Sequence, residues 1–481
     1  MQDDRDRQIA KLEEELADLR TLVKALLADN ASLRAENVQL RAANEELRRR
    51  LGQNSSNSSK PPSGDAPADR GARPVKPGSG KKQGGQPGHK GSRRVFLSPT
   101  VPPVDCFPQS CRRCFKKLKR RRDPEAIRHQ TVDVPKIVPV VREWRLHRGQ
   151  CDCGETTCAQ LPPGVPLGLC EPGLIALIAL LTGDYNMGRR RAVTLLSDLL
   201  GIEISLGALS EAEGKASEAV AEPAEAVRQY VAEQPVKNTD ATGWLQGGKA
   251  RTLWTIATPL ATFFGVCLDG TMPKLRALFA KIRGILISDR GTQFGFWAMD
   301  QRQICWAHLI RLFVAFEERS GPAGVLGENL LLCAQTMIHA WHKVRDGTMS
   351  RRQFGKLMAG LGPVIEGHLD HGGHLGISGV SGACQNILKH RQALWTFVRV
   401  KGVEPTNNGA ERSLRAFVLW RKRSFGSQSD RGTLFAARLM TVTHTLRKQK
   451  RHVLSYLTDA CHAALHGKSA PSLLPLAIPT P

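Results

Sequence analysis

Residues 236–248 read Val-Lys-Asn-Thr-Asp-Ala-Thr-Gly-Trp-Leu-Gln-Gly-Gly, and this stretch decides the fold class. Residues 236–246 alternate in the manner of a β-strand, and Gly247-Gly248 is a two-residue hairpin signal. Two further strands are predicted at 251–258 and 261–268, with Pro259 at the turn between them. The stretch therefore begins an antiparallel sheet of three strands.

The next segment predicts a crossover back to the first strand. Pro273 begins a helix that runs through Ile282, Gly284 ends it, and a short buried strand follows at 285–288. In a ribonuclease H-like fold, this fourth strand lies beside the first at the centre of the sheet. We therefore expect an α/β protein with a ribonuclease H-like catalytic domain at 236–460, which contains a helical insertion at about 320–400.

Two aspartates accompany the two central strands, and a glutamate stands far downstream. Asp240 lies in the first strand, Asp289 ends the fourth, and Glu411 precedes a strongly basic helical stretch. Two hard cations about 4 Å apart need oxygen ligands, one of which usually bridges them. We therefore predict that these three carboxylates bind two Mg²⁺ or Mn²⁺ ions against a nucleic-acid phosphate.

Each carboxylate also has a purely structural interpretation. Asp240 would be a strand residue beside a turn, and Asp289 would pair with the arginine that follows it or cap the next helix. Glu411 would complete a capping box with Asn408 and form an i,i+4 ion pair with Arg415. Other carboxylates in the region compete for the same role: Asp269, Asp300, Glu317 and Glu404.

Basic and histidine residues accompany the predicted carboxylate site. His308 follows the fourth strand, where it would contact substrate or position a phosphate, or would be an ordinary core histidine. Downstream of Glu411, four basic residues are predicted to contact DNA phosphates: Arg412, Arg415, Arg421 and Lys422. A solvated basic helix face is the alternative.

The charge of the whole chain indicates a polyanionic partner. The 481 residues carry a formal net charge of +25, and Lys and Arg gain affinity by releasing phosphate counterions. The first residues are charged and lack the apolar core of a signal peptide. The longest apolar run, 174–181, is too short to span a bilayer. We therefore expect a cytoplasmic protein that is not embedded in a membrane.

Residues 1–52 predict a dimerisation element. Leucines recur every seven residues, at Leu12, Leu19, Leu26, Leu33, Leu40 and Leu47. The companion seam positions hold mostly β-branched residues or Asn, which favours a parallel two-stranded coiled coil and hence a homodimer or higher oligomer. A single amphipathic helix packed on its own domain is the alternative. Residues 53–100 are rich in Asn, Ser, Gly and Pro and predict a flexible basic linker.

Residues 101–165 predict a small zinc-binding module. The pairs Cys111/Cys114 and Cys151/Cys153 flank a strand-like segment at 132–141, a pattern that can enclose a tetrahedral Zn²⁺. Cys158 or Cys106 are alternative ligands, and free thiols are the other interpretation. The basic residues between the pairs predict a DNA-contact surface; they include Lys116, Lys117, Arg120 and Arg121.

Residues 166–235 predict a helical domain. Pro172 begins one helix, a second runs over 189–200 and ends at Gly201, and Ser205 caps a third over 206–220. A helix, a glycine turn and a capped helix are typical of a helix-turn-helix, although the same pattern is common in protein cores. Residues 461–481 are expected to form a C-terminal tail.

As an ordered series, these motifs resemble the transposase of the IS66 family of bacterial insertion sequences over nearly the whole chain. The segments that carry the resemblance are the leucine heptads, the cysteine module, and residues 54–62, 84–91, 240–244, 288–290, 305–308, 406–412 and 420–426. Two positions differ from the usual family pattern. Ala241 replaces a glutamate, and Gly291 replaces an aromatic residue that often follows the Ser-Asp-Arg sequence.

The resemblance implies a DDE-type transposase in which Asp240, Asp289 and Glu411 are the metal-binding carboxylates. Such an enzyme hydrolyses DNA at the element ends and uses the exposed 3′-hydroxyls to attack target DNA, without a covalent protein intermediate. Its partners would be element ends, target DNA and small companion proteins encoded by the same element. The resemblance also implies a bacterial, nucleoid-associated protein.

Two other functions are compatible with the same residues. One is a dimeric zinc-containing DNA-binding protein with a degenerate nuclease domain, and the other is a ribonuclease H-like nuclease without strand transfer. The presence of all three carboxylates favours the transposase. The sequence does not determine the terminal repeat, the target preference, or whether transposition is replicative or cut-and-paste.

Overall fold

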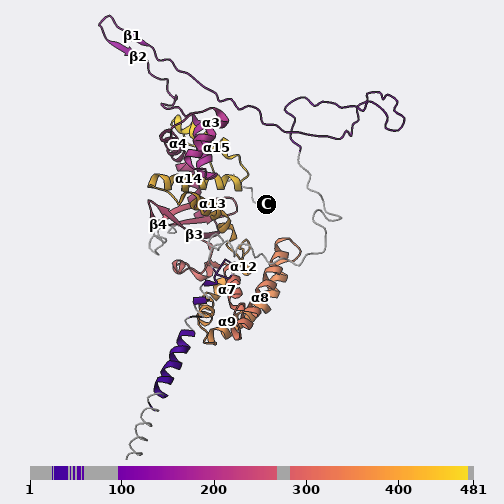
Figure 1. Ribbon diagram of the computed structural model, residues 1–481, viewed down its shortest axis with the longest axis vertical. Helices are drawn as coiled ribbons and strands as arrows, with labels where there is room; N and C mark the ends of the chain where they lie inside the picture. The colour runs from indigo at the N-terminus through magenta and orange to yellow at the C-terminus, as the bar shows by residue number, and fades with distance from the viewer. Residues whose placement is uncertain are drawn as a thin grey trace, which may run out of the picture.

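The computed structural model describes residues 96–267 and 282–474, together with Lys24 and most of residues 27–58. It shows a mixed α/β protein in which one five-stranded sheet packs against three groups of helices (Figure 1). The helix predicted at 273–282 lies almost entirely outside the described residues, as do the first 23 residues of the predicted coiled coil and most of the predicted linker.

The central sheet has the strand order β5-β4-β3-β6-β7. The strands are β3 (Val236–Gln246), β4 (Lys249–Ala257), β5 (Thr262–Cys267), β6 (Ile285–Ser288) and β7 (Arg302–Ile304). The first three are antiparallel, and β6 and β7 run parallel to β3. The structure confirms the predicted strands and the two-residue turn, in which Gly247 and Gly248 have φ values of 54° and 76°.

Aromatic residues join one face of the sheet to α13 (Asn408–Ser424) and α14 (Asp430–Lys448). The rings of Trp244 and Phe417 meet edge to face with their centroids 5.5 Å apart. On α14, the Thr441 hydroxyl accepts the backbone N–H of Phe264 at 3.1 Å, which fastens this helix to the edge strand β5. The packing fixes the direction of α13 and therefore the position of its first turn.

A second group of helices covers the end of the molecule near α14 (Figure 1). They are α2 (Pro172–Ala179) with its π-helical extension η2 (Leu180–Asp184), α3 (Arg189–Leu200), α4 (Leu206–Ala219), α5 (Ala221–Glu233) and α15 (Val453–Leu465). As predicted, Gly201 ends α3 in the left-handed conformation, and the Ser205 side chain accepts the N–H of Ala208 at 3.1 Å. One apolar core joins these helices to the sheet, so the predicted helical domain at 166–235 is continuous with the residues that follow it.

A third group of helices occupies most of residues 306–399 and extends from the other end of the sheet (Figure 1). They are α7 (Trp306–Glu317), α8 (Pro322–Arg345), α9 (Arg351–His374), α10 (Ser381–Lys389), α11 (Arg391–Leu394) and α12 (Thr396–Arg399). Between β6 and β7 lie two short 3-10 turns, η3 (Thr292–Phe294) and η4 (Met299–Gln301). The third group has its own apolar core, in which Trp306, Phe313 and Phe354 are buried.

The segment before α2 is extended and projects away from the helices and the sheet (Figure 1). Its hairpin consists of β1 (Arg148–Gln150) and β2 (Thr156–Cys158). The strand predicted at 132–141 is wrong, because this stretch has no strand partner among the described residues and its valines are exposed. Farther upstream, the described residues from 27 to 41 are helical, and Leu33 and Leu40 are 63% and 61% exposed. Within the described part of the chain, no helix is both long enough and apolar enough to cross a membrane.

Candidate active site

Asp240 lies in β3, and Asp289 directly follows the neighbouring parallel strand β6. Asn238 of β3 stands opposite Ile287 of β6, so continuing the register by two residues brings the two aspartates opposite one another. Both are half-buried. Their carboxylates interact, because Asp289 contributes to raising the pKa of Asp240. The structure thus brings together two side chains that are far apart in the sequence.

The backbone around Asp289 is held by a buried arginine of β7. Arg302 is 0% exposed, donates to the Ser288 hydroxyl at 3.2 Å, and donates to the backbone carbonyl of Asp289 at 2.8 Å. The Asp289 side chain also accepts the N–H of Gly291 at 2.9 Å, which closes a local turn. The Asp289 side chain therefore stabilises the turn that follows it. Among the described residues it neither caps a helix nor forms an ion pair with Arg290.

The first turn of α13 brings Glu411 to the same region. Its N-cap is Asn407, which is fully buried and donates through its side chain to the backbone carbonyl of Thr239 at 3.4 Å. The backbone N–H of Asn407 also donates to the Cys305 sulfur at 3.3 Å. The predicted capping box between Asn408 and Glu411 is wrong, because the N-cap lies one residue earlier and makes no side-chain cap bond.

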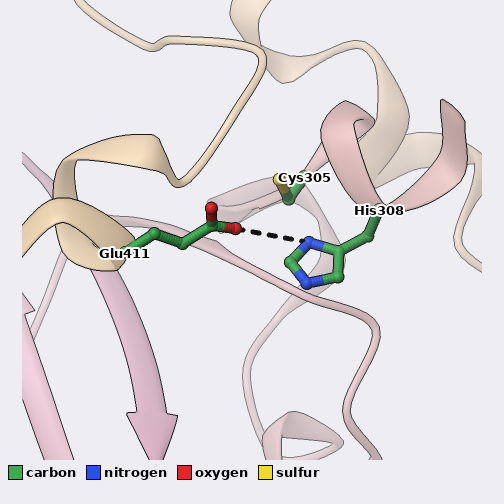
Figure 2. A group of neighbouring side chains, drawn as sticks. All are labelled: Cys305, His308 and Glu411. Carbon is green, nitrogen blue, oxygen red and sulfur yellow. Dashed lines mark ion pairs between the residues drawn. The ribbon is translucent and has the colours of Figure 1, made fainter. Parts of the chain in front are cut away.

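The Glu411 carboxylate faces the start of α7, as Figure 2 shows. Its Oε1 lies 3.8 Å from His308 Nδ1 and 3.8 Å from an Arg311 guanidinium nitrogen. The two helix starts are joined by the N–H of Trp306, which donates to the Pro405 carbonyl at 2.9 Å. The described residues form these two pairs with Glu411 instead of the predicted i,i+4 pair with Arg415.

Burial sets the protonation tendencies of this group. Desolvation is the main cause that raises the pKa of Asp240 to about 7; the carboxylates of Glu411 and Asp289 contribute to the rise, and Arg311 opposes it. Burial also raises the pKa of Glu411, whereas Arg311 and Arg412 lower it. For His308, burial and then Arg311 lower the pKa to about 4, so the imidazole is neutral near pH 7. Clustered carboxylates with raised pKa values are typical of functional sites.

One group of potential metal ligands stands out among the described residues. Atoms of Cys305, His308 and Glu411 all lie within 4.8 Å of one another, and no other set of three or more such residues is gathered this closely in the described ranges. Cys305 is fully buried, and burial raises the pKa of its thiol to about 11. It is therefore a neutral thiol that accepts a backbone hydrogen bond, and we interpret it as a packing residue.

A cavity of about 670 Å³ lies against the first turn of α13. Arg345, Arg412 and Lys448 contribute to its lining, together with Glu404 and the α13 residue Gly409. Burial and the nearby charge of Arg412 lower the pKa of Lys448 to about 8. The excess of basic groups over acidic groups suits an anionic ligand.

The four basic α13 residues singled out in the sequence differ in their surroundings. Arg412 and Arg415 are exposed. Arg421 donates to the Thr242 hydroxyl at 3.2 Å and to the backbone carbonyl of Gly243, so it joins α13 to β3. Lys422 is exposed and has a partner within the chain. Arg421 therefore has a structural role whether or not it also contacts DNA.

The predicted zinc ligands lie in two separate turns. Cys111 lies beside Cys114, and Cys151 lies beside Cys153. In each pair, hydrogen bonds from the backbone and then from the side chain of the second cysteine lower the pKa of the first thiol. The alternatives Cys106 and Cys158 are exposed. The two turns do not meet in one group of ligands within the described residues, and the zinc site stays a prediction. Lys116, Lys117, Arg120 and Arg121 are exposed on the same module.

Comparison with known families gave two matches. The model of the IS66 transposase family matches residues 168–434, which is more than half of the chain. The chain therefore belongs to the IS66 transposase family. Residues 4–95 match a second family, which is described as a family of unknown function (DUF6444). A comparison with individual curated proteins found no match.

Three residues of the site were not identified from the sequence. Arg302 and Asn407 position Asp289 and the start of α13, and Arg311 faces Glu411. The available signals were an arginine at the start of the short Arg302-Gln303-Ile304 stretch and the Asn407-Asn408-Gly409 run at the start of a helix. Neither pattern indicates which distant backbone atom the side chain binds.

Proposed function

We propose that this chain is a DDE-type DNA transposase whose catalytic carboxylates are Asp240, Asp289 and Glu411. The observation that carries the proposal is their convergence. The register between β3 and β6, continued by two residues, sets the two aspartates beside each other, and the charge of Glu411 is near enough to contribute to raising the pKa of Asp240. Membership of the IS66 transposase family supports the same reading.

The topology supports a ribonuclease H-like fold. Three antiparallel strands are followed by two strands parallel to the first, in the order β5-β4-β3-β6-β7. This is the order expected for that fold, with the two aspartate-bearing strands adjacent at the centre. The helices at 306–399 lie between the second aspartate and Glu411, where the insertion was expected.

The residues fit a pair of divalent cations such as Mg²⁺ or Mn²⁺. Carboxylate oxygens are hard ligands, and the Glu411 Oε1 atom is buried with no hydrogen-bond partner among the described residues. The mutual repulsion that helps raise the pKa of Asp240 would be relieved by positive charge. When bound, such cations activate an attacking oxygen and stabilise the leaving oxygen of a phosphoryl transfer.

The other residues position the DNA and the carboxylates. Arg302 fixes the backbone at Asp289, and Asn407 fixes the start of α13 relative to β3. Arg412 is exposed at the basic cavity, where it would bind a backbone phosphate of the element end or of the target. The net charge of +25 supports this DNA partner.

Two features outside the catalytic domain belong to the same proposal. The exposed Leu33 and Leu40 side chains support self-association through residues 1–52, and sedimentation of the full chain at several concentrations measures it. The paired cysteine turns support a structural Zn²⁺, which metal analysis of the purified chain measures. Small companion proteins of the same element belong in the DNA assays.

The test is a strand-cleavage and strand-transfer assay on DNA that carries the inverted repeats flanking the gene. We expect cleavage with Mg²⁺ or Mn²⁺ by the wild-type chain, and none after Asp240→Ala, Asp289→Ala or Glu411→Ala. Unchanged cleavage by Asp240→Ala would exclude the proposed metal site. Binding of the ends without any cleavage would favour the alternative, a zinc-containing DNA-binding protein with a degenerate nuclease domain.

A further inference from the structure

Two buried polar atoms face one another between α7 and α13 without forming a hydrogen bond. His308 Nδ1 and Glu411 Oε1 are 3.8 Å apart, whereas hydrogen bonds between nitrogen and oxygen span about 2.7–3.2 Å. Neither atom has any hydrogen-bond partner in the described structure, and both are inaccessible to solvent. Figure 2 shows the imidazole and the carboxylate directed toward each other. Leaving two such atoms unpaired is costly unless something else satisfies them.

The separation suits one shared cation. Divalent metals bind histidine nitrogen and carboxylate oxygen at about 2.0–2.2 Å, so two ligands of one ion lie about 3–4 Å apart. The measured 3.8 Å falls in this range. His308 and Glu411 lie in the first turns of α7 and α13. The hydrogen bond from Trp306 to Pro405 holds these two helix ends together, so the fold sets the distance between the two side chains.

We propose that His308 is a metal ligand alongside Glu411, binding through Nδ1 the cation that this carboxylate holds in the proposed active site. The assignment rests on the proposed function for the role of Glu411, but its geometry is independent of Asp240. It makes one of the two cation positions a mixed nitrogen and oxygen site. Mg²⁺ strongly prefers oxygen ligands, so an imidazole shifts the preference toward Mn²⁺ and Co²⁺.

The neighbouring groups are compatible with this assignment. Arg311 lies 3.8 Å from the same Glu411 oxygen, too far for a hydrogen bond, and approaches as a counter-charge. Asp289 and Arg290 also lie near His308, and they have opposite effects on its pKa: Asp289 raises it and Arg290 lowers it. The sulfur of Cys305 is occupied by the N–H of Asn407 and faces the interior, so it is not assigned as a ligand.

The direct test is pulsed electron paramagnetic resonance of Mn²⁺ bound to the full-length wild-type chain. We expect a ¹⁴N coupling from a directly bound imidazole. Its absence from a chain that binds Mn²⁺ would overturn the assignment of His308. This readout needs neither activity nor a substituted protein.

A substitution series gives the second measurement. His308→Asn is expected to weaken the binding of Mn²⁺ and Co²⁺ by about tenfold or more, which is the usual effect of losing a contact at a metal site. The binding of Mg²⁺ is expected to weaken by less than about threefold. His339→Asn is the matched control, because His339 is exposed on the neighbouring α8. Equal losses for all three metals, or no loss, would contradict the proposal. Thermal unfolding without metal establishes that both variants are folded.

Co²⁺ separates this proposal from a different metal site. The bound ion should show no sulfur-to-metal charge-transfer band, because the Cys305 sulfur accepts the N–H of Asn407 and is not a ligand in this assignment. Appearance of that band would assign a Cys305-His308-Glu411 site instead, and the proposal would be wrong. If nitrogen coupling is present but the wild-type chain does not cleave DNA, the proposed function fails and the assignment of His308 as a ligand stands. If the chain cleaves DNA but shows no nitrogen coupling, the proposed function stands and the assignment of His308 fails.

Discussion

The side-chain amide of Asn407 donates to the backbone carbonyl of Thr239, one residue before Asp240, at 3.4 Å. This contact fastens the start of α13 to the strand that carries the first aspartate, while the backbone N–H of Asn407 fastens it to Cys305 at the start of α7. A single buried residue thereby relates Glu411 to both neighbouring elements. The convergence of the proposed ligands depends on it.

We predict that Asn407→Ala destabilises the chain by about 1–3 kcal/mol and strongly reduces DNA cleavage. The substitution removes a buried amide and leaves the Thr239 carbonyl without that donor. Chemical denaturation and single-turnover cleavage measure the two effects. Asn408→Ala is the control, because Asn408 is exposed; its stability should change by less than about 0.5 kcal/mol. Equal effects of the two substitutions would contradict the positioning role.

Asp240→Asn should stabilise the metal-free chain, by on the order of 1 kcal/mol, while abolishing cleavage. Burial and the neighbouring carboxylates raise the pKa of Asp240 from 3.8 to about 7, so the ionised folded form is disfavoured. The wild-type chain in EDTA therefore loses stability as the pH rises from about 4 through 7, and the Asn variant loses less. Thermal unfolding across this range measures the difference. A variant that is less stable in EDTA, yet still gains stability from Mn²⁺, would contradict the prediction.

Arg421→Gln should lower the free energy of unfolding by about 1–3 kcal/mol, because it removes bonds to Thr242 and Gly243 that join α13 to β3. Arg423 is exposed on the same helix turn and serves as the matched control, with an expected change within about 0.5 kcal/mol. Urea denaturation compares them. If both variants are as stable as the wild type, Arg421 is not a structural anchor.

Arg412→Gln should weaken DNA binding without lowering stability, since Arg412 is exposed at the basic cavity. One lost phosphate contact is expected to reduce the slope of log affinity against log salt by about one. Fluorescence anisotropy in EDTA measures binding separately from cleavage. Arg352→Gln, on the exposed face of α9, provides the comparison and should leave the slope unchanged. An unaltered slope for Arg412→Gln would remove this residue from the DNA interface.

Local patterns predicted the elements that carry the two aspartates. The alternation at 236–246 and the Gly247-Gly248 turn are properties of neighbouring residues, and both glycines have the positive φ that the turn requires. The Ser205 cap and the left-handed Gly201 were predictable for the same reason. The strand predicted at 132–141 was wrong because a strand also needs a partner, and alternating valines do not supply one.

The surroundings of the site depend on contacts between distant residues. Arginine is usually a surface residue, but Arg302 is fully buried. Its burial is tolerated because carbonyl groups of the turn after β6 accept its hydrogen bonds. Glu411 matched a capping box by spacing, but Asn407 occupies the N-cap and Glu411 faces α7. The approach of His308 to Glu411 follows from the packing of two helix starts, which no local pattern encodes.

The most direct test of the central claim is single-turnover cleavage of DNA bearing the flanking repeats, in Mg²⁺, by Glu411→Gln and Asp300→Asn. Asp300 is an exposed carboxylate of the same domain. We predict that Glu411→Gln slows cleavage by about a thousandfold or more, since several kcal/mol of transition-state stabilisation are lost, and that Asp300→Asn cleaves like the wild type. Cleavage by Glu411→Gln at the wild-type rate would contradict the assignment of Asp240, Asp289 and Glu411 as the catalytic centre.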